Sequence, residues 1–171
     1  MKRILAAVDL TQYAPGVVSQ AIELATLTKS DLTLLSVINS NPLSTSTMKG
    51  EEERLRTLHR ELIVKNFPAK TLKPESGRFG PSYVYGPNAE VRINSRIEHG
   101  DVVDKICACA NEIDADLIIL GTRGLGEIGS LVGSVSEKVV RKASSSVMVV
   151  KHDQSAGVDT HSHKSRHART G

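Results

Sequence analysis

The apolar residues of this chain alternate between short continuous runs and longer stretches with helical spacing. A continuous run such as 3–8 (RILAAV) is typical of a strand that is covered on both faces of a parallel sheet. In 15–29 the apolar residues recur at helical spacing instead, which indicates a helix with one buried side. The pattern predicts strands at 3–8, 32–38, 91–99, 116–121 and 146–150, and helices at 15–29, 51–65, 102–113 and 134–143.

Strands that alternate with helices favour a single doubly wound α/β domain, in which helices cover both faces of a parallel sheet. Segment 67–90 departs from this pattern, because it contains four prolines and four of the five aromatic residues of the chain. Long irregular segments inside a compact domain are often functional loops or disordered. We therefore expect a loop insertion, whose aromatic residues either anchor it or form a lid or partner surface. These aromatic residues are Phe67, Phe79, Tyr83 and Tyr85.

Length and charge limit the classes of function. The 171 residues fit one domain, 1–151, and a basic, histidine-rich tail, 152–171, which we expect to be disordered. Part of the net charge of +3 lies in the tail, so little net positive charge remains on the domain. We therefore expect no basic face that would bind nucleic acid. Asp9 interrupts the first apolar run too early for a signal peptide, and no run is long enough to cross a membrane, so we expect a cytoplasmic protein. A solvated tail is the simpler interpretation of its histidines, although His161, His163 and His167 leave transition-metal binding open.

The predicted helix 102–113 carries both cysteines. Asp101 precedes it and is a suitable N-cap residue. Cys107 and Cys109 are two positions apart, so on a helix their side chains point in different directions. We expect buried, reduced thiols rather than a disulfide or a metal site.

A glycine-rich stretch, GTRGLGEIGSLVGSVSEK (121–138), contains the literal dinucleotide fingerprint GLGEIG. That fingerprint requires glycines directly after a strand and an acidic residue about 20 positions later, which would hold a ribose. Here GLGEIG begins three residues beyond the strand end at Gly121, and the later position is Val149. A P-loop is also excluded, because no Gly-Lys-Ser/Thr follows. The match to an NAD site is therefore accidental.

The same stretch fits a different kind of phosphate site. It leaves the carboxyl end of a predicted parallel strand and ends where a helix begins, and open parallel sheets bind ligands at such ends. The backbone amides of 133–136 would surround an anion at the helix start. Asp9, at the end of the first strand, would instead accept hydrogen bonds from ribose hydroxyls or an adenine amine. Further donors are the hydroxyls of Thr122, Ser134 and Ser136 and the guanidinium of Arg123.

Four segments in order make the chain resemble the universal stress protein family: ILAAVDLT, LTLLSVI, EHGDVVDKICACANEIDADLIILGTRG and GSVSEKVVRKASSSVMVV. The resemblance covers nearly all of 1–151 outside 67–90. It implies a doubly wound domain with a five-stranded parallel sheet of order 3-2-1-4-5, and a homodimer in which the last strands, 146–150, meet. It also implies a regulatory role in stress response, in which a protein partner is possible.

The ATP-binding branch of that family carries Gly-x2-Gly-x9-Gly-Ser/Thr after the fourth strand, and the matching residues here are Gly121, Gly124, Gly133 and Ser134. The resemblance implies that ATP binds with Mg2+ held through its phosphates. Ala7, Val8, Asp9 and Val37 would then line the adenosine. The phosphates would lie along the loop and the helix start, which adds Thr122, Arg123, Val135 and Ser136.

The match is not complete, because eight residues separate Gly124 from Gly133, one fewer than in the family pattern. The shortened loop leaves a second reading open, a non-nucleotide module of the family branch that works through protein partners. The sequence shows no paired acid and base and no Ser-His-Asp arrangement. We therefore expect no enzymatic activity beyond slow ATP hydrolysis or autophosphorylation at Ser134 or Ser136.

Overall fold

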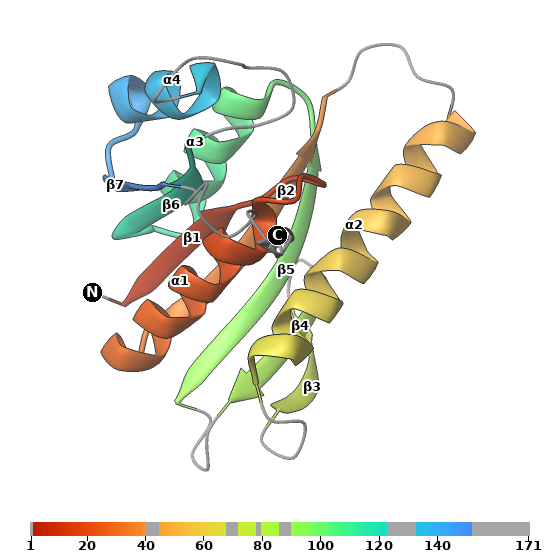
Figure 1. The fold of residues 1–171 in the computed structure, drawn as a ribbon, viewed down its shortest axis with the longest axis vertical. Helices are drawn as coiled ribbons and strands as arrows, with labels where there is room; N and C mark the ends of the chain where they lie inside the picture. The colour runs from red at the N-terminus through yellow and green to blue at the C-terminus, as the bar shows by residue number, and fades with distance from the viewer. Residues whose placement is uncertain are drawn as a thin grey trace, which may run out of the picture.

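A seven-stranded mixed sheet forms the centre of the molecule (Figure 1). The computed structural model describes residues 2–39, 45–67, 72–77, 80–85, 90–122 and 133–151. The sheet has the order β3-β4-β5-β2-β1-β6-β7. Its strands are β1 (Arg3–Ala7), β2 (Asp31–Ile38), β3 (Leu72–Gly77), β4 (Gly80–Tyr85), β5 (Val91–His99), β6 (Leu117–Gly121) and β7 (Ser146–Val150). The helices are α1 (Ala14–Thr28), α2 (Thr45–Asn66), α3 (Val102–Glu112) and α4 (Ser134–Lys142).

The prediction of a five-stranded, all-parallel sheet is wrong. Strands β5, β2, β1, β6 and β7 are the five predicted ones, and they are mutually parallel. Strands β3 and β4 add an antiparallel hairpin beside β5, in the segment for which the sequence predicted a loop. The prolines that suggested a loop are tolerated there. Pro74 lies in the edge strand β3, and Pro81 lies just outside the residues of β4 that pair with β5.

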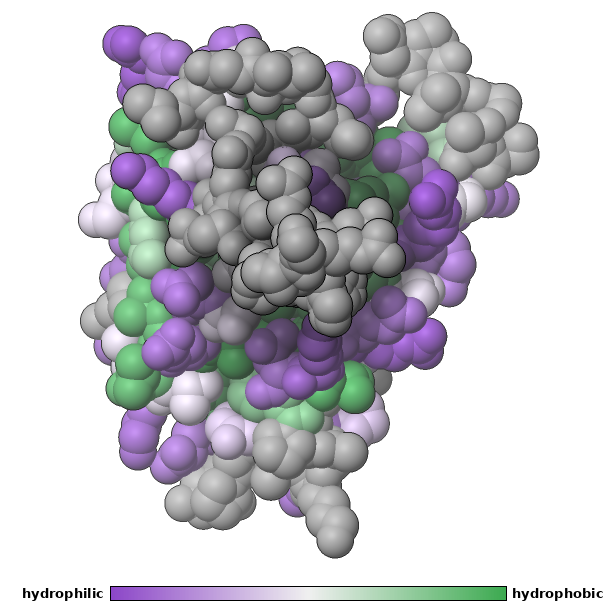
Figure 2. Space-filling view, viewed as in Figure 1, coloured by the Kyte–Doolittle hydropathy of each residue, from purple (hydrophilic) through white to green (hydrophobic). Residues whose placement is uncertain are grey.

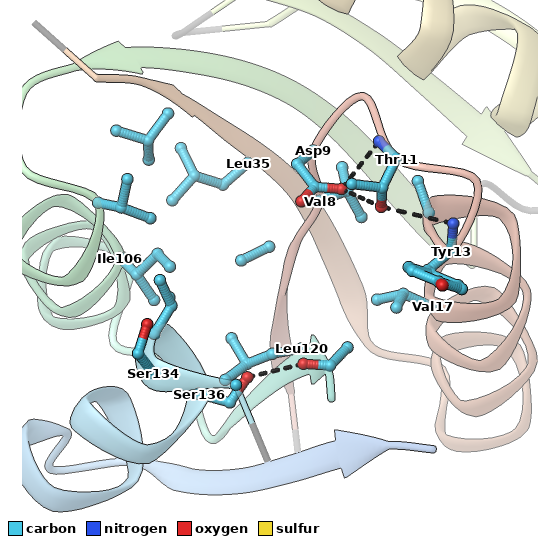
Figure 3. Close-up of a pocket in the computed structure, with 17 residues that line it drawn as sticks. Val8, Asp9, Thr11, Tyr13, Val17, Leu35, Ile106, Leu120, Ser134 and Ser136 are labelled. Carbon is cyan, nitrogen blue, oxygen red and sulfur yellow. Dashed lines mark hydrogen bonds between the residues drawn. The ribbon is translucent and has the colours of Figure 1, made fainter. Parts of the chain in front are cut away.

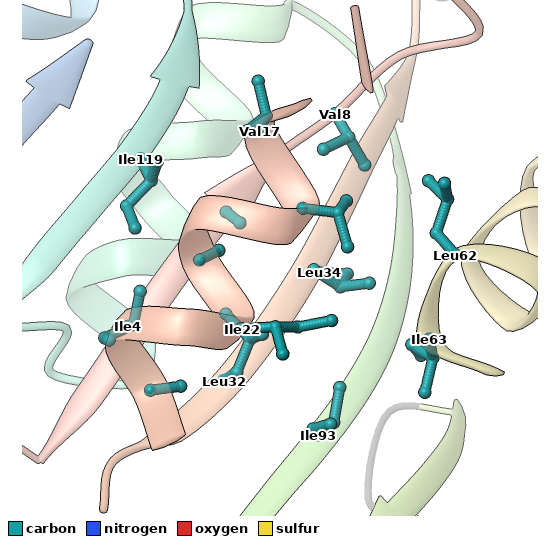
Figure 4. Packing of buried hydrophobic residues seen from close by; sticks show 14 of the residues in the cluster. Ile4, Val8, Val17, Ile22, Leu32, Leu34, Leu62, Ile63, Ile93 and Ile119 are labelled. Carbon is teal, nitrogen blue, oxygen red and sulfur yellow. The ribbon is translucent and has the colours of Figure 1, made fainter. Parts of the chain in front are cut away.

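Helices α1 and α2 cover one face of the sheet, and α3 and α4 cover the other. Consecutive residues of the central strands point to opposite faces, so Leu34 packs with the α1–α2 cluster (Figure 4) and Leu35 with the α3–α4 cluster. This double burial explains why the central strands are continuous apolar runs. Hydrophilic residues line the outward side of α2 (Figure 2), which accounts for its charged sequence. The doubly wound α/β architecture is therefore confirmed.

Helix α3 follows its prediction closely. Asp101 is its N-cap, and the Asp101 Oδ1 atom accepts a hydrogen bond of 2.9 Å from the Asp104 amide. Cys107 and Cys109 are free and buried, and burial raises the pKa of both thiols, that of Cys109 to about 11. Both cysteines are therefore protonated thiols at neutral pH, and their burial without a disulfide agrees with the prediction.

Two other predictions concern the C-terminal tail and membrane-spanning segments. The histidine-rich tail, 152–171, lies outside the described residues. Within the described ranges, no helix is long and apolar enough to cross a bilayer.

Candidate functional site

A cleft of about 220 Å³ opens at the carboxyl ends of the central strands (Figure 3). It lies where the strand order reverses: the chain leaves β1 toward α1 and β2, and leaves β6 toward α4 and β7, on the opposite side of the sheet. The two connections diverge and leave a crevice, which is where open parallel sheets bind ligands. The cleft is lined by Ala7, Val8, Asp9, Thr11, Tyr13, Ala14, Val17, Leu35, Val37, Val102, Ile106, Leu120, Gly121, Gly133, Ser134, Val135 and Ser136.

One rim of the cleft is the turn between β1 and α1. The Asp9 Oδ1 atom accepts hydrogen bonds from both the amide, at 3.0 Å, and the hydroxyl of Thr11. The Thr11 hydroxyl oxygen in turn accepts from the Tyr13 amide, at 3.4 Å. These contacts hold the carboxylate in place through one of its oxygens. No described residue donates to the Asp9 Oδ2 atom, and an ionised carboxylate accepts through both oxygens, so Oδ2 can accept from a ligand in the cleft.

The opposite rim is the start of α4 (Figure 3). Gly133 is the N-cap residue, and its amide donates to the carbonyl of Thr122. The Ser136 hydroxyl donates to the Gly121 carbonyl, at 2.7 Å, so the first turn of α4 is tied to the end of β6. The first amides of a helix have no intrahelical acceptor and give this end a partial positive charge. The rim therefore favours an anion, whereas Asp9 across the cleft disfavours one.

Between the two rims the wall is apolar. It is formed by Val8 of the β1 end, Leu35 and Val37 of β2, and Val102 and Ile106 of α3. An apolar slot between a carboxylate and an anion-favouring helix start suits a ligand with a flat apolar part, hydroxyl or amine donors, and a negative group. A nucleotide has all three.

Nine of the predicted site residues line this one cleft: Ala7, Val8, Asp9, Val37, Gly121, Gly133, Ser134, Val135 and Ser136. Thr122 does not line it. The Thr122 side chain is buried beside a smaller cavity, next to Tyr13 and Val150. Arg123 and Gly124 lie outside the described residues.

The sequence interpretation missed part of the lining. Thr11 and Tyr13 follow Asp9 directly, so their place at a strand end could have marked them. Val102 and Ile106 were predicted only as the buried side of a helix, because helical spacing shows burial and not the neighbouring element. The missed residues are Thr11, Tyr13, Ala14, Val17, Leu35, Val102, Ile106 and Leu120.

Comparison with known proteins shows the family of this chain. Residues 1–151 match the model of the universal stress protein family. The chain belongs to this family. Among its relatives, a putative universal stress protein of Staphylococcus saprophyticus is 32% identical over 158 residues, which cover 90% of this chain and 85% of the relative. One from Staphylococcus haemolyticus is 30% identical over 156 residues, which cover 90% and 86%.

Solved structures share the fold of this universal stress protein. UspA from Lactobacillus plantarum superposes with a TM-score of 0.66 at 20% identity, covering 87% of this chain and 97% of that one. A universal stress protein in complex with cAMP has a TM-score of 0.61 at 21% identity, covering 87% and 96%. The Archaeoglobus fulgidus protein in complex with dAMP has a TM-score of 0.59 at 21% identity, covering 87% and 97%. Some structural neighbours thus bind nucleotides.

Proposed function

We propose that this universal stress protein binds ATP in the cleft at the ends of β1 and β6 and acts as a nucleotide-responsive regulator in the stress response. The observation that carries the proposal is the pairing of two rims: a fixed carboxylate at Asp9 faces the anion-favouring start of α4 across an apolar slot. The structural neighbours in complex with cAMP and dAMP support a nucleotide as the ligand.

The charges of the two rims predict how the nucleotide is oriented in the cleft. Asp9 would accept hydrogen bonds from the ribose hydroxyls or the adenine amine, and it would repel phosphate. Ala7, Val8 and Val37 would contact the adenosine. The phosphates would lie at the other rim, on the amides of 133–136, where the helix start offers donors and partial positive charge.

The residues present fit a Mg2+ ion that is carried by the phosphates. Among the described residues, Asp9 is the one acidic residue that lines the cleft, and no group of three metal-binding side chains is found. Mg2+ usually keeps several waters and binds through substrate phosphates with one or two carboxylates. A dedicated protein cage is therefore not needed.

The proposal is tested on the purified full-length protein. The protein is heat-denatured, its supernatant is chromatographed for adenine nucleotide, and ATP with Mg2+ is then titrated into the nucleotide-free form. We expect bound nucleotide or a melting temperature that rises with ATP concentration, since a ligand at about 100 times its Kd stabilises the folded state by about 3 kcal/mol. Absence of both effects would contradict the proposal. It would favour instead the interaction module that the shortened glycine loop leaves open.

A further inference from the structure

A second cleft, of about 210 Å³, lies between α2 and the outer strands β4 and β5. It is nearly as large as the first cleft and shares no lining residue with it. One wall comes from the hairpin, through Pro81 and Tyr83 of β4. The lining residues are Glu53, Arg56, Thr57, Arg60, Pro81, Tyr83 and Ser95.

The floor of this cleft is a hydrogen-bonded chain. Ser95 is 3% exposed, and its hydroxyl lies 2.8 Å from Nδ1 of the fully buried His59. The His59 Nε2 atom lies 2.9 Å from the hydroxyl of Ser36, which donates to the Val8 carbonyl at 2.7 Å. A hydroxyl has one proton, so Ser36 accepts from Nε2–H, and Nδ1 accepts the proton of Ser95. The Ser95 oxygen therefore faces the cleft as an acceptor, which suits a ligand hydroxyl.

The α2 wall carries two arginines one helical turn apart, so their guanidinium groups can reach the same ligand. Arg56 donates a hydrogen bond from Nη2 to the carboxylate of Glu52, and its other guanidinium nitrogens can donate to a ligand. Arg60 makes no ion pair with any described residue. Two arginine forks on one site match the geometry of a phosphate group.

Glu53 provides the opposite chemistry at the other end of the wall. It is exposed, and its carboxylate has no partner among the described residues. Glu53 lies seven positions before Arg60, which is about 10 Å along a helix axis. A ligand that spans the cleft therefore meets donors at the Arg60 end and acceptors at Glu53 and Ser95.

We propose that this second cleft binds a small organic phosphate that carries hydroxyl groups, of the sugar phosphate type. The phosphate lies on Arg56 and Arg60, and ligand hydroxyls donate to Glu53 and Ser95. The half-buried ring of Tyr83, which packs on the α1–α2 cluster, faces the carbon skeleton. The site is separate from the nucleotide cleft and does not depend on ATP binding there.

The test uses amide NMR spectra of the full-length protein, because a site-resolved signal separates the two clefts. Glucose 6-phosphate and inorganic phosphate are titrated at constant ionic strength. We expect saturable shifts of the amide signals of 53–60, 82–83 and 95, with tighter binding of glucose 6-phosphate than of inorganic phosphate. Arg60→Ala weakens both ligands about tenfold, since it removes charged hydrogen bonds. Glu53→Gln weakens glucose 6-phosphate and leaves inorganic phosphate unchanged or slightly tighter.

Arg54→Ala is the matched control, because Arg54 is an exposed residue of the same helix that does not line the cleft. Its removal changes the net charge equally and should alter affinity by less than about twofold. The inference is overturned if glucose 6-phosphate produces no saturable shifts at these residues. Equal losses of ligand affinity in the Arg54 and Arg60 variants would also overturn the inference, because they would indicate a general attraction of the anion to a charged helix.

Discussion

At the scale of single residues, His59 makes stability depend on pH. Burial, with a smaller effect from the nearby Arg56 charge, lowers the pKa of His59 from about 6.5 to about 4. The folded state therefore binds the proton less well than the unfolded state. Neutral His59 therefore makes its full contribution to the free energy of unfolding above pH 6.5. As the pH falls toward 4, this contribution is lost, which lowers the free energy of unfolding by about 3 kcal/mol. Urea unfolding at pH 7.5 and at pH 4.5 should show this decrease.

His59→Gln separates this effect from general acid denaturation. A glutamine amide can still donate to one serine and accept from the other, but it does not titrate. We expect the variant to lose much less stability than the wild type between pH 7.5 and 4.5. His99→Gln, at the other histidine of the described ranges, should retain the wild-type decrease. If the His59 variant loses as much stability between the two pH values as the wild type, His59 is not the source of the decrease.

At the scale of elements, the proposed nucleotide site places the phosphates at the start of α4. Gly133 has φ −66° and ψ 156°, an extended conformation that valine also adopts, and it lines the cleft. Gly133→Val should therefore fold, with a loss of about 1 kcal/mol at the N-cap. Its side chain would occupy space at the phosphate end, so we expect no measurable ATP binding by calorimetry. Gly50→Val is the control, because a Cβ atom there meets nothing within 4 Å. Unchanged affinity in the Gly133 variant would exclude this end of the cleft as the phosphate site.

The elements also differ in how far the sequence could predict them. The central strands were predictable because both faces are buried, so that neighbours such as Leu34 and Leu35 must both be apolar. The hairpin was not, because Pro74 and Pro81 usually argue against strands. Only the pairing partners reveal that Pro74 lies in the edge strand β3 and that Pro81 lies outside the residues of β4 that pair with β5.

The candidate site shows the same limit. Asp9 and the start of α4 were predictable, because a strand end and a helix start have local sequence patterns. Val102 and Ile106 reach the cleft only through the packing of α3 on the sheet, which helical spacing does not encode. The second cleft was also not predictable, since one of its walls is the unpredicted hairpin.

At the scale of the whole molecule, the two edges of the sheet are unlike each other. The hairpin extends one edge with β3, whose described side chains at 73–75 are exposed and include a lysine, a proline and a glutamate. Such residues discourage pairing with another strand. The other edge is β7, in which four consecutive apolar residues, 147–150, are only half-buried. An apolar edge strand favours association, so β7 is the edge through which we expect two copies of the chain to meet.

Val149→Lys tests this expectation. Sedimentation or light scattering should give twice the chain mass for the wild type and the single chain mass for the variant, because a lysine on an edge strand opposes strand pairing. Val64→Lys is the control, since Val64 is 47% exposed on α2, on the far side of the sheet from β7. It introduces the same charge and should leave the dimer intact. A wild-type monomer at high concentration, or a dimer that survives Val149→Lys, would contradict assembly through β7. If Val149→Lys does dissociate the dimer, a wild-type dimer that is stabilised by ATP would identify β7 as the output of nucleotide binding, because α4, which lines the proposed nucleotide cleft, directly precedes β7.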